Sequence, residues 1–445
     1  MNIKKICLLV GLSILSTPSY AANWLSLQGT EPASSAPRAK VWGFIQPEYQ
    51  STDGGTLPAG TPFAGQIMSP NVIRPDNKST ETFNIRRARI GVRGAGFPLD
   101  DKVNYFFLAE FGRNGITKPA KTGVALTDAS ITLNHIEGAR IRVGQFKTPG
   151  AEEGLAAIHV FNYNNFTNVT NQMLLERFTD GDGSAVDGKP GGLAGVSNGL
   201  NGSVSAFRDQ GIQVFNTFKV KNWEHSYAVM YGNGNGINRA DNNDSKETYL
   251  YWSSELVYGG KGGRREGLKM FAWNQSGTRT LTTSDANGKG DYDRDRSGFG
   301  LTFHKNRYRA AAEYVTADGM IFNGSDLGAI PGASNNAANN TADINVLTED
   351  KADGYYLDFG YKIMPNLELD ARYDVLNRGT ETSAGERKFD TLTLGAQYFF
   401  NKKTRVTFNY EIRNQEAPNL PATHNANKIA DSLDDLMSVS FLAIF

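Results

Sequence analysis

Five arginines at alternating positions, and a lysine that follows them, are the residues whose type and spacing indicate chemistry most clearly. They lie in two short segments: Arg87, Arg89 and Arg93, then Arg140, Arg142 and Lys147. A guanidinium group offers a rigid fork of donors that matches the oxygens of phosphate, sulfate or carboxylate. A row of such groups predicts a track that binds anions.

The residues between these arginines are small or apolar: Ala88, Ile90, Val92, Ile141 and Val143. This alternation has the two-residue period of a strand with two unlike faces. An arginine on the lipid face of a membrane barrel costs about 2–4 kcal/mol at the bilayer midplane, so we expect the arginines to face a lumen. An alternative stays open, in which they pair with inward acids such as Glu110 and Asp128 and only stiffen the wall.

Acids in the C-terminal third of the chain occupy similar alternating positions. They are Glu313, Glu368, Asp370, Asp374 and Glu411. If these side chains also face inward, the lumen has arginines on one wall and carboxylates on another. The pattern therefore predicts a transverse electric field.

The C-terminal segment 436–445 ends on an aromatic residue and is typical of a strand. Phe441 and Phe445 share one face, and Ser438 and Ser440 share the other. As the edge of a soluble sheet such a strand invites aggregation, whereas a closed barrel supplies a pairing partner. The ending is similar to the recognition signal of bacterial outer-membrane barrels. We therefore expect Phe441 and Phe445 to contact outer-membrane lipid and to serve as a signal for the barrel assembly machinery.

Strand-like segments follow one another along most of the chain. We predict sixteen, near 40–50, 82–94, 102–111, 124–136, 139–147, 209–220, 223–232, 248–258, 267–276, 297–305, 307–316, 353–363, 367–376, 390–400, 404–413 and 432–445. Mean hydropathy is −0.42, and no stretch contains 18 consecutive apolar residues, which excludes transmembrane helices. Barrel strands alternate lipid-facing and lumen-facing residues, so they average out as mildly polar.

Tight turns and long connections alternate between these segments. The tight turns lie at 137–138, 221–222, 305–306, 364–366 and 401–403. Outer-membrane barrels have short periplasmic turns and long extracellular loops, and sixteen strands place both termini on the periplasmic side. The prediction is an all-β, antiparallel, up-and-down transmembrane barrel. A soluble propeller or sandwich is the alternative, but it explains neither this parity nor the terminal phenylalanine.

The N-terminal residues predict export. Lys4 and Lys5 precede an apolar run, and Ser19 and Ala21 suit a cleavage site, so we expect residues 1–21 to be a signal peptide. Residues 22–37 are expected to form a flexible periplasmic lead-in and residues 38–445 the barrel. Cleavage removes two lysines and no acids, so 46 basic and 46 acidic residues become 44 and 46, a net charge of −2. The single cysteine lies in the leader, so the mature chain has no disulfide.

Three segments resemble signatures of the phosphate-selective porin O and P family. They are 83–94 (FNIRRARIGVRG), Asp128-Ala129 leading to 140–149 (RIRVGQFKTP), and Leu175-Glu176-Arg177; a turn at 233–236 (NGNG) is a further likeness. The resemblance is densest from about 83 to 236. It implies an outer-membrane channel for phosphate-like solutes that assembles as a homotrimer. Gly150 stands where the family commonly has an aromatic residue, which leaves the selectivity open.

The longest connection, 148–208, is the third on the extracellular side. Connections this long inside a compact fold are usually functional, and the third loop of sixteen-stranded porins narrows the lumen. We therefore expect a constriction loop that presents charge to the pore through Glu152, Glu153, Glu176 and Arg177. The alternative is a flap on the outer surface.

Other motif matches in the chain do not predict a function. Residues 195–199 match a nucleophile elbow but lack its strand and helix, and residues 180–184 and 291–295 lack the glycine and glutamate of a calcium loop. We expect no catalytic residue, metal, cofactor or nucleic-acid partner. The runner-up function is an outer-membrane barrel enzyme of the lipase or protease type, which a conductance measurement would separate from a channel. A plugged transporter would need a plug domain, and the lead-in is too short for one.

Overall fold

The computed structural model describes most of the barrel and part of its connections. The described residues are 25, 37–53, 57–61, 64–65, 80–96, 100–114, 116–117, 123–175, 207–260, 265–281, 290–324, 344–347 and 349–445. The signal peptide, nearly all of the lead-in, and Glu176 and Arg177 of the predicted constriction loop lie outside them.

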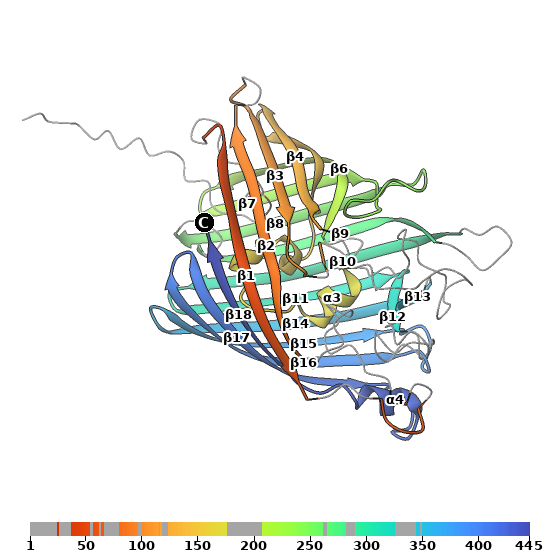
Figure 1. Cartoon of the computed structure of the whole chain (residues 1–445). Helices are drawn as coiled ribbons and strands as arrows, with labels where there is room; N and C mark the ends of the chain where they lie inside the picture. Colours follow the sequence, from red (N-terminus) through yellow and green to blue (C-terminus); the bar gives the residue numbers. More distant parts are fainter. Residues whose placement is uncertain are drawn as a thin grey trace, which may run out of the picture.

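The described strands form a closed, all-antiparallel barrel of sixteen strands (Figure 1). Its strands are β1 (Lys40–Thr52), β2 (Glu81–Ala95), β3 (Val103–Glu110), β4 (Ala125–Ile136), β5 (Ala139–Lys147), β6 (Arg208–Val220), β7 (Trp223–Gly232), β8 (Glu247–Gly259), β9 (Glu266–Leu281), β10 (Gly290–Lys305), β11 (Tyr308–Asp318), β14 (Lys351–Met364), β15 (Leu367–Arg378), β16 (Arg387–Asn401), β17 (Thr404–Glu416) and β18 (Leu436–Ile444). Each pairs with its neighbours in the sequence, and β1 pairs with β18 to close the ring. The predicted strand number and topology are therefore confirmed.

Two features of the strands differ from the prediction. At the end with the long connections, β9 extends five residues further than expected and β10 seven residues further, because residues 290–296 keep the antiparallel pairing with residues 275–281. In the sequence between β11 and β14, the strands β12 (Ile321–Gly324) and β13 (Ile344–Leu347) pair with each other as a separate hairpin outside the barrel sheet. These two strands are only four residues long, too short for a periodic signal in the sequence.

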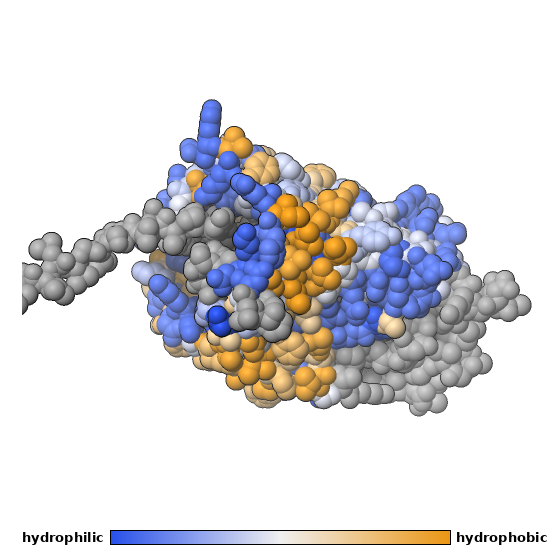
Figure 2. Space-filling view, turned by 90° about the horizontal axis from the view of Figure 1, so that it is seen from above, coloured by the Kyte–Doolittle hydropathy of each residue, from blue (hydrophilic) through white to orange (hydrophobic). Residues whose placement is uncertain are grey.

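The outward faces of the barrel strands are apolar. In β14, for example, the side chains of Leu357 and Phe359 are about half exposed, whereas that of Tyr356, the residue before Leu357, is 3% exposed. The space-filling view shows the resulting band of hydrophobic side chains between two hydrophilic rims (Figure 2). Phe441 and Phe445 belong to this outward face, with exposed fractions of 40% and 54%. A band of this kind is what the hydrocarbon core of a bilayer requires.

Short helices lie in the connections. After β5 come α2 (Glu152–Leu155), the 3-10 helix η1 (Ile158–Val160) and α3 (Asn168–Met173), which packs against β12, β14, β15 and β16. α4 (Asn425–Ala430) lies between β17 and β18 at the rim with the long connections (Figure 1), where its Ala426 and Ile429 pack with Leu57. Among the helices of the described residues, none is long and apolar enough to cross a membrane.

Candidate functional site

The described residues 151–175 of the connection after β5 cross the interior of the barrel. Asn164 marks the far end of this path: its backbone N–H donates to Asn409 of β17 (2.7 Å), and its side-chain amide donates to the hydroxyl of Ser438 (3.0 Å). The Ser440 hydroxyl donates back to Asn164 Oδ1 (2.5 Å). The connection therefore reaches from β5 to the inward face of the terminal strand β18. This position is that of a loop inside the lumen and not of an outer flap.

Two arginines of the barrel wall also bind this segment of the loop. Arg372 of β15 donates to the carbonyl of Asn165 (3.1 Å), and its guanidinium lies 4.2 Å from the centre of the Tyr163 ring. Arg405 of β17 donates to the carbonyl of Phe161. Burial raises the pKa of Tyr163 well above its usual value, so the phenol stays neutral and donates to Asp358 (2.5 Å).

The predicted loop acids Glu152 and Glu153 lie in the lumen but are neutralised by cations of the wall. Glu152 accepts from Lys269 of β9 at 2.6 Å, and Glu153 accepts from Arg372 at 3.0 Å. Glu153 also accepts from the Thr167 hydroxyl at 2.7 Å, just before α3. Both acids thus fix the position of the loop, and their charges are compensated within 3 Å.

Lys147, predicted as an anion ligand, holds the start of the loop. Its ammonium donates to the carbonyl oxygens of Gly154 (2.7 Å) and Ala156 (2.7 Å), at the end of α2. These partners carry no formal charge, so they hold the Lys147 side chain at the loop without forming an ion pair with it.

The three predicted arginines of β2 face inward but differ in their partners. Arg89 donates to Glu110 of β3 at 2.6 Å, as the stiffening alternative expects. Arg87 donates to the neutral amide of Gln46 at 2.7 Å. The guanidinium of Arg93 lies 5.5 Å from the centre of the Trp42 ring.

The two predicted arginines of β5 pack against aromatic rings. Arg140 donates to Asn134 (2.7 Å) and lies over Phe215 at 5.3 Å. Arg142 lies over Phe215 at 4.5 Å and over Phe146 at 5.3 Å, and its exposed fraction is 0%. Arg142 therefore points inward as predicted, yet it is covered by neighbouring side chains.

The sequence pattern missed Arg86, which also faces inward. Gln46 pairs with Arg87 and the next residue, Pro47, pairs with Ile85, so Arg86 is the extra residue of a bulge. Proline lacks the N–H that a regular ladder needs, and a bulge lets two consecutive side chains share a face. Arg86 is fully buried, pairs with Glu48 and donates to Asn165 of the loop at 2.9 Å. Two adjacent arginines before Ala88 were the available signal, because regular alternation would place one of them in lipid.

The acids predicted on the opposite wall do lie on its inward face, but cations stand among them. All five are buried: Glu313, Glu368, Asp370, Asp374 and Glu411. Arg309 pairs with three carboxylates, those of Glu368, Asp370 and Asp358. This wall is therefore a mixed network and not the uniform row of acids that a simple transverse field requires.

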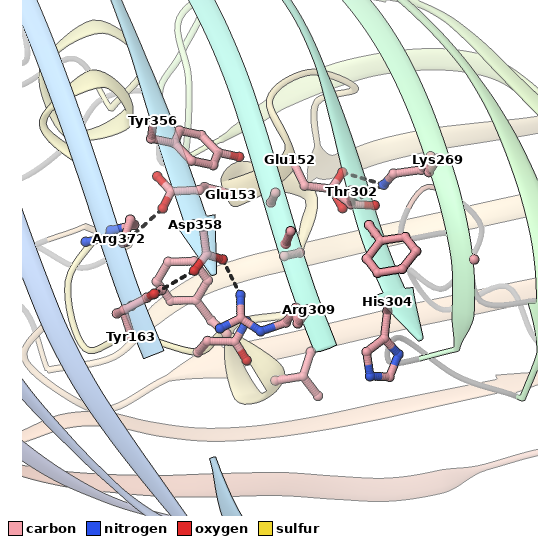
Figure 3. A pocket seen from close by; sticks show the side chains of 18 of the residues that line it. Glu152, Glu153, Tyr163, Lys269, Thr302, His304, Arg309, Tyr356, Asp358 and Arg372 are labelled. Carbon is pink, nitrogen blue, oxygen red and sulfur yellow. Dashed lines mark hydrogen bonds and ion pairs between the residues drawn. The ribbon is translucent and has the colours of Figure 1, made fainter. Parts of the chain in front are cut away.

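A cavity of about 150 Å³, open to solvent, lies between the loop and strands β8 to β15 (Figure 3). Arg309, Asp358 and Tyr163 meet at one side of it, and the Glu152–Lys269 pair lies at the other. Positive and negative side chains alternate around this cavity, so it has no dominant sign of charge.

A second cavity of about 80 Å³ lies between the loop and strands β1 to β6, and we call it the cationic pocket. Its charged lining residues are Arg89, Arg93, Lys147, Arg208 and Asp128. Asp128 accepts from Arg208 of β6 at 3.0 Å, a partner that the sequence did not single out. His159 of η1 also lines this pocket; burial, then the neighbouring cations, lower its pKa to about 4, so the imidazole is neutral at pH 7.

Comparisons with known proteins agree with this architecture. Similar solved structures include the outer membrane channel DcaP of Acinetobacter baumannii (13% identity, 94% of this chain and 100% of that chain, TM-score 0.52). A second is the outer-membrane protein OmpT of Vibrio cholerae with loop L8 deleted (10% identity, 92% of this chain and 99% of that chain, TM-score 0.50). A third is Salmonella typhi OmpF in complex with daunomycin (14% identity, 92% of this chain and 97% of that chain, TM-score 0.50). At these identities the likeness concerns the fold. No curated protein matches the sequence.

The closed sixteen-strand barrel, its apolar outer band and the loop across its lumen are the architecture of a porin of the bacterial outer membrane. Residues 71–257 match the model of the phosphate-selective porin O and P family. This match confirms the resemblance seen in the arginine-containing segments.

Proposed function

We propose that this porin is a passive diffusion channel that prefers small anions, phosphate-like solutes among them. The observation that carries the proposal is the charge of the cationic pocket. Its four cations face two carboxylates, Asp128 in the lining and Glu110 behind Arg89, which leaves a formal charge of +2. The family name of the matched segment points to the same class of solute.

Local charge outweighs the net charge of the chain in such a pocket. Two unit charges 4 Å apart interact by about 4 kcal/mol at an effective dielectric of 20. The Debye length at physiological salt is about 8 Å, so acids on the far wall act weakly on an ion beside β2. The mature net charge of −2 is spread over the whole protein and does not oppose this attraction.

The test is the zero-current potential across a planar bilayer in a KCl gradient. Replacing Arg87 and Arg93 with glutamine removes two inward positive charges and leaves the Arg89–Glu110 pair in place. We expect the ratio of chloride to potassium permeability to fall by about twofold or more. A matched control is Lys402→Gln with Lys403→Gln, which removes two exposed charges at the short turn between β16 and β17. A wild type that prefers cations would refute the proposal.

Three further inferences concern the assembly of the protein, its processing and its loop. We infer that the protein is a homotrimer, as the family resemblance implies, and that residues 1–21 are removed and residues 22–37 precede the barrel in the periplasm. We also infer that the connection 148–208 acts as the constriction loop, with Glu152 and Glu153 positioning it. The mass of the detergent-purified protein and its N-terminal sequence test the first two inferences.

A further inference from the structure

One wall of the cationic pocket is aromatic. The rings of Trp42 and Phe106 stack at 6.0 Å and 20°, and those of Trp42 and Phe44 stack at 6.4 Å and 26°. The imidazole of His159 lies 5.8 Å from Trp42 and 5.7 Å from Phe44. All four rings line the pocket.

The rest of the uncharged lining is apolar as well. Leu108 of β3, Leu155 of α2, and Ala157 and Ile158 of the loop complete it. A small inorganic anion makes hydrogen bonds and gains nothing from such a wall, because apolar surface cannot replace the water that the anion loses. An apolar cavity with a few placed polar groups is typical of a site for an organic ligand.

Two of the cations lie over rings of the aromatic wall. Arg93 lies 5.5 Å from the centre of the Trp42 ring, and Arg89 lies 5.7 Å from the centre of Phe44. A ligand ring that stacks on Trp42 and Phe106 would therefore place an attached carboxylate next to a guanidinium. Two rings and a fixed fork of donors match a flat aromatic acid in both shape and charge.

We propose that the cationic pocket binds aromatic monocarboxylates, with the ring on Trp42 and Phe106 and the carboxylate at Arg93. The inference rests on the proposed anion channel and narrows its solutes to a chemical class. It assigns Trp42 and Phe106 as specificity-determining residues, a role distinct from that of the arginines, which attract anions of any shape.

The experiment compares three carboxylates as blockers of single-channel KCl current: benzoate, cyclohexanecarboxylate and acetate. All carry one negative charge, and only benzoate has a flat aromatic ring. We expect benzoate to reach half block at a concentration roughly tenfold lower than either of the others. Equal potency of benzoate and cyclohexanecarboxylate would overturn the aromatic assignment, and equal potency of all three would overturn the site.

A variant separates this inference from the anion preference. Trp42→Leu with Phe106→Leu keeps the wall apolar but removes both rings, so benzoate should lose its tenfold advantage over cyclohexanecarboxylate, while the four cations of the pocket remain in the chain. Trp252→Leu, on the outward face, is the matched control, and benzoate should block its current at the same concentration as in the wild type. If the wild type prefers anions but benzoate block survives in the double variant, only the further inference fails. If the wild type prefers cations, the proposed function fails first.

Discussion

At the scale of single residues, many cationic side chains inside this barrel hold the loop in position in addition to carrying charge. Lys147 and Arg405 donate to backbone carbonyl oxygens of the loop, and Arg296 of β10 donates to the carbonyls of Met173 (2.8 Å) and Met320 (2.8 Å). A carbonyl oxygen satisfies the donor without cancelling the formal charge. Such residues therefore fix the loop without the charge cancellation of an ion pair, which Arg89 and Glu110 do form.

His159 gives the loop a pH dependence. Its imidazole is packed against Trp42 and Phe44, and the charged groups that face it are Arg405 of β17, Lys147 of β5, and Arg89 and Arg93 of β2. In place, its pKa is about 4; a solvated histidine has a pKa near 6.5. The displaced loop binds more protons, so a fall in pH through this window favours displacement.

We expect single-channel conductance of the wild type to rise as pH falls from about 6.5 towards 4, relative to His159→Phe, whose ring keeps the packing and does not titrate. The carboxylates that titrate in the same range are common to both proteins, so the difference between them isolates His159. His135→Phe, at the exposed rim beside Asp100, should follow the wild type. Identical pH profiles for the wild type and His159→Phe would contradict the prediction.

At the scale of elements, the loop across the lumen is held at both ends by different strands. β5 holds residues 154–156 through Lys147, and β15, β17 and β18 hold residues 161–165. The acids Glu152 and Glu153 fix the two residues just before the first of these stretches. The barrel wall therefore does not depend on the loop for its own hydrogen bonds, since each strand pairs with its neighbours.

Deletion of residues 156–172 should raise single-channel conductance and weaken ion selectivity, because it removes the segment that crosses the lumen and leaves the wall closed. The deletion also exposes buried wall charges, and their hydration favours wider ion passage. Deletion of residues 381–384, an exposed part of the connection between β15 and β16, is the control and should leave the conductance as it is. Unchanged conductance after the first deletion would mean that the loop does not limit the flow.

At the scale of the whole molecule, closure of the barrel depends on the last residues. Phe445 N–H donates to the carbonyl of Gly43 (3.0 Å), and Gly43 N–H donates to that of Phe445 (3.3 Å). A Cβ at position 43 would lie 2.4 Å from the Phe445 ring, so only glycine allows this ring to lie there. The final phenylalanine thus joins the last strand to the first and faces lipid.

Deletion of Phe445 should reduce the amount of assembled barrel in outer membranes, because it removes this pair of hydrogen bonds and the predicted assembly signal. Heat-modifiable migration on gels measures the folded fraction. Phe400→Ala, which removes another lipid-facing ring, should assemble at near wild-type levels. Normal assembly of the shortened chain would show that Phe445 is dispensable.

The sequence by itself determined the strands, their faces and their closure. Alternation of apolar and polar residues is a local property, and a one-residue slip would place a whole charged face in lipid, so the inward position of Arg87, Arg89 and Arg93 followed from the pattern alone. The alternation of tight turns and long connections likewise determined the topology. The C-terminal position of Phe445 pointed to the pairing of β18 with β1.

Only the tertiary structure decided which charges meet. Asp128 pairs with Arg208 and not with the arginines of β2, Glu153 pairs with Arg372, and Arg86 turns inward through a bulge. Glu153 and Arg372 are 219 positions apart in the chain, and they are brought together by the path of one loop across the lumen. That path depends on the summed contacts of many distant side chains, and no local period in the sequence records it.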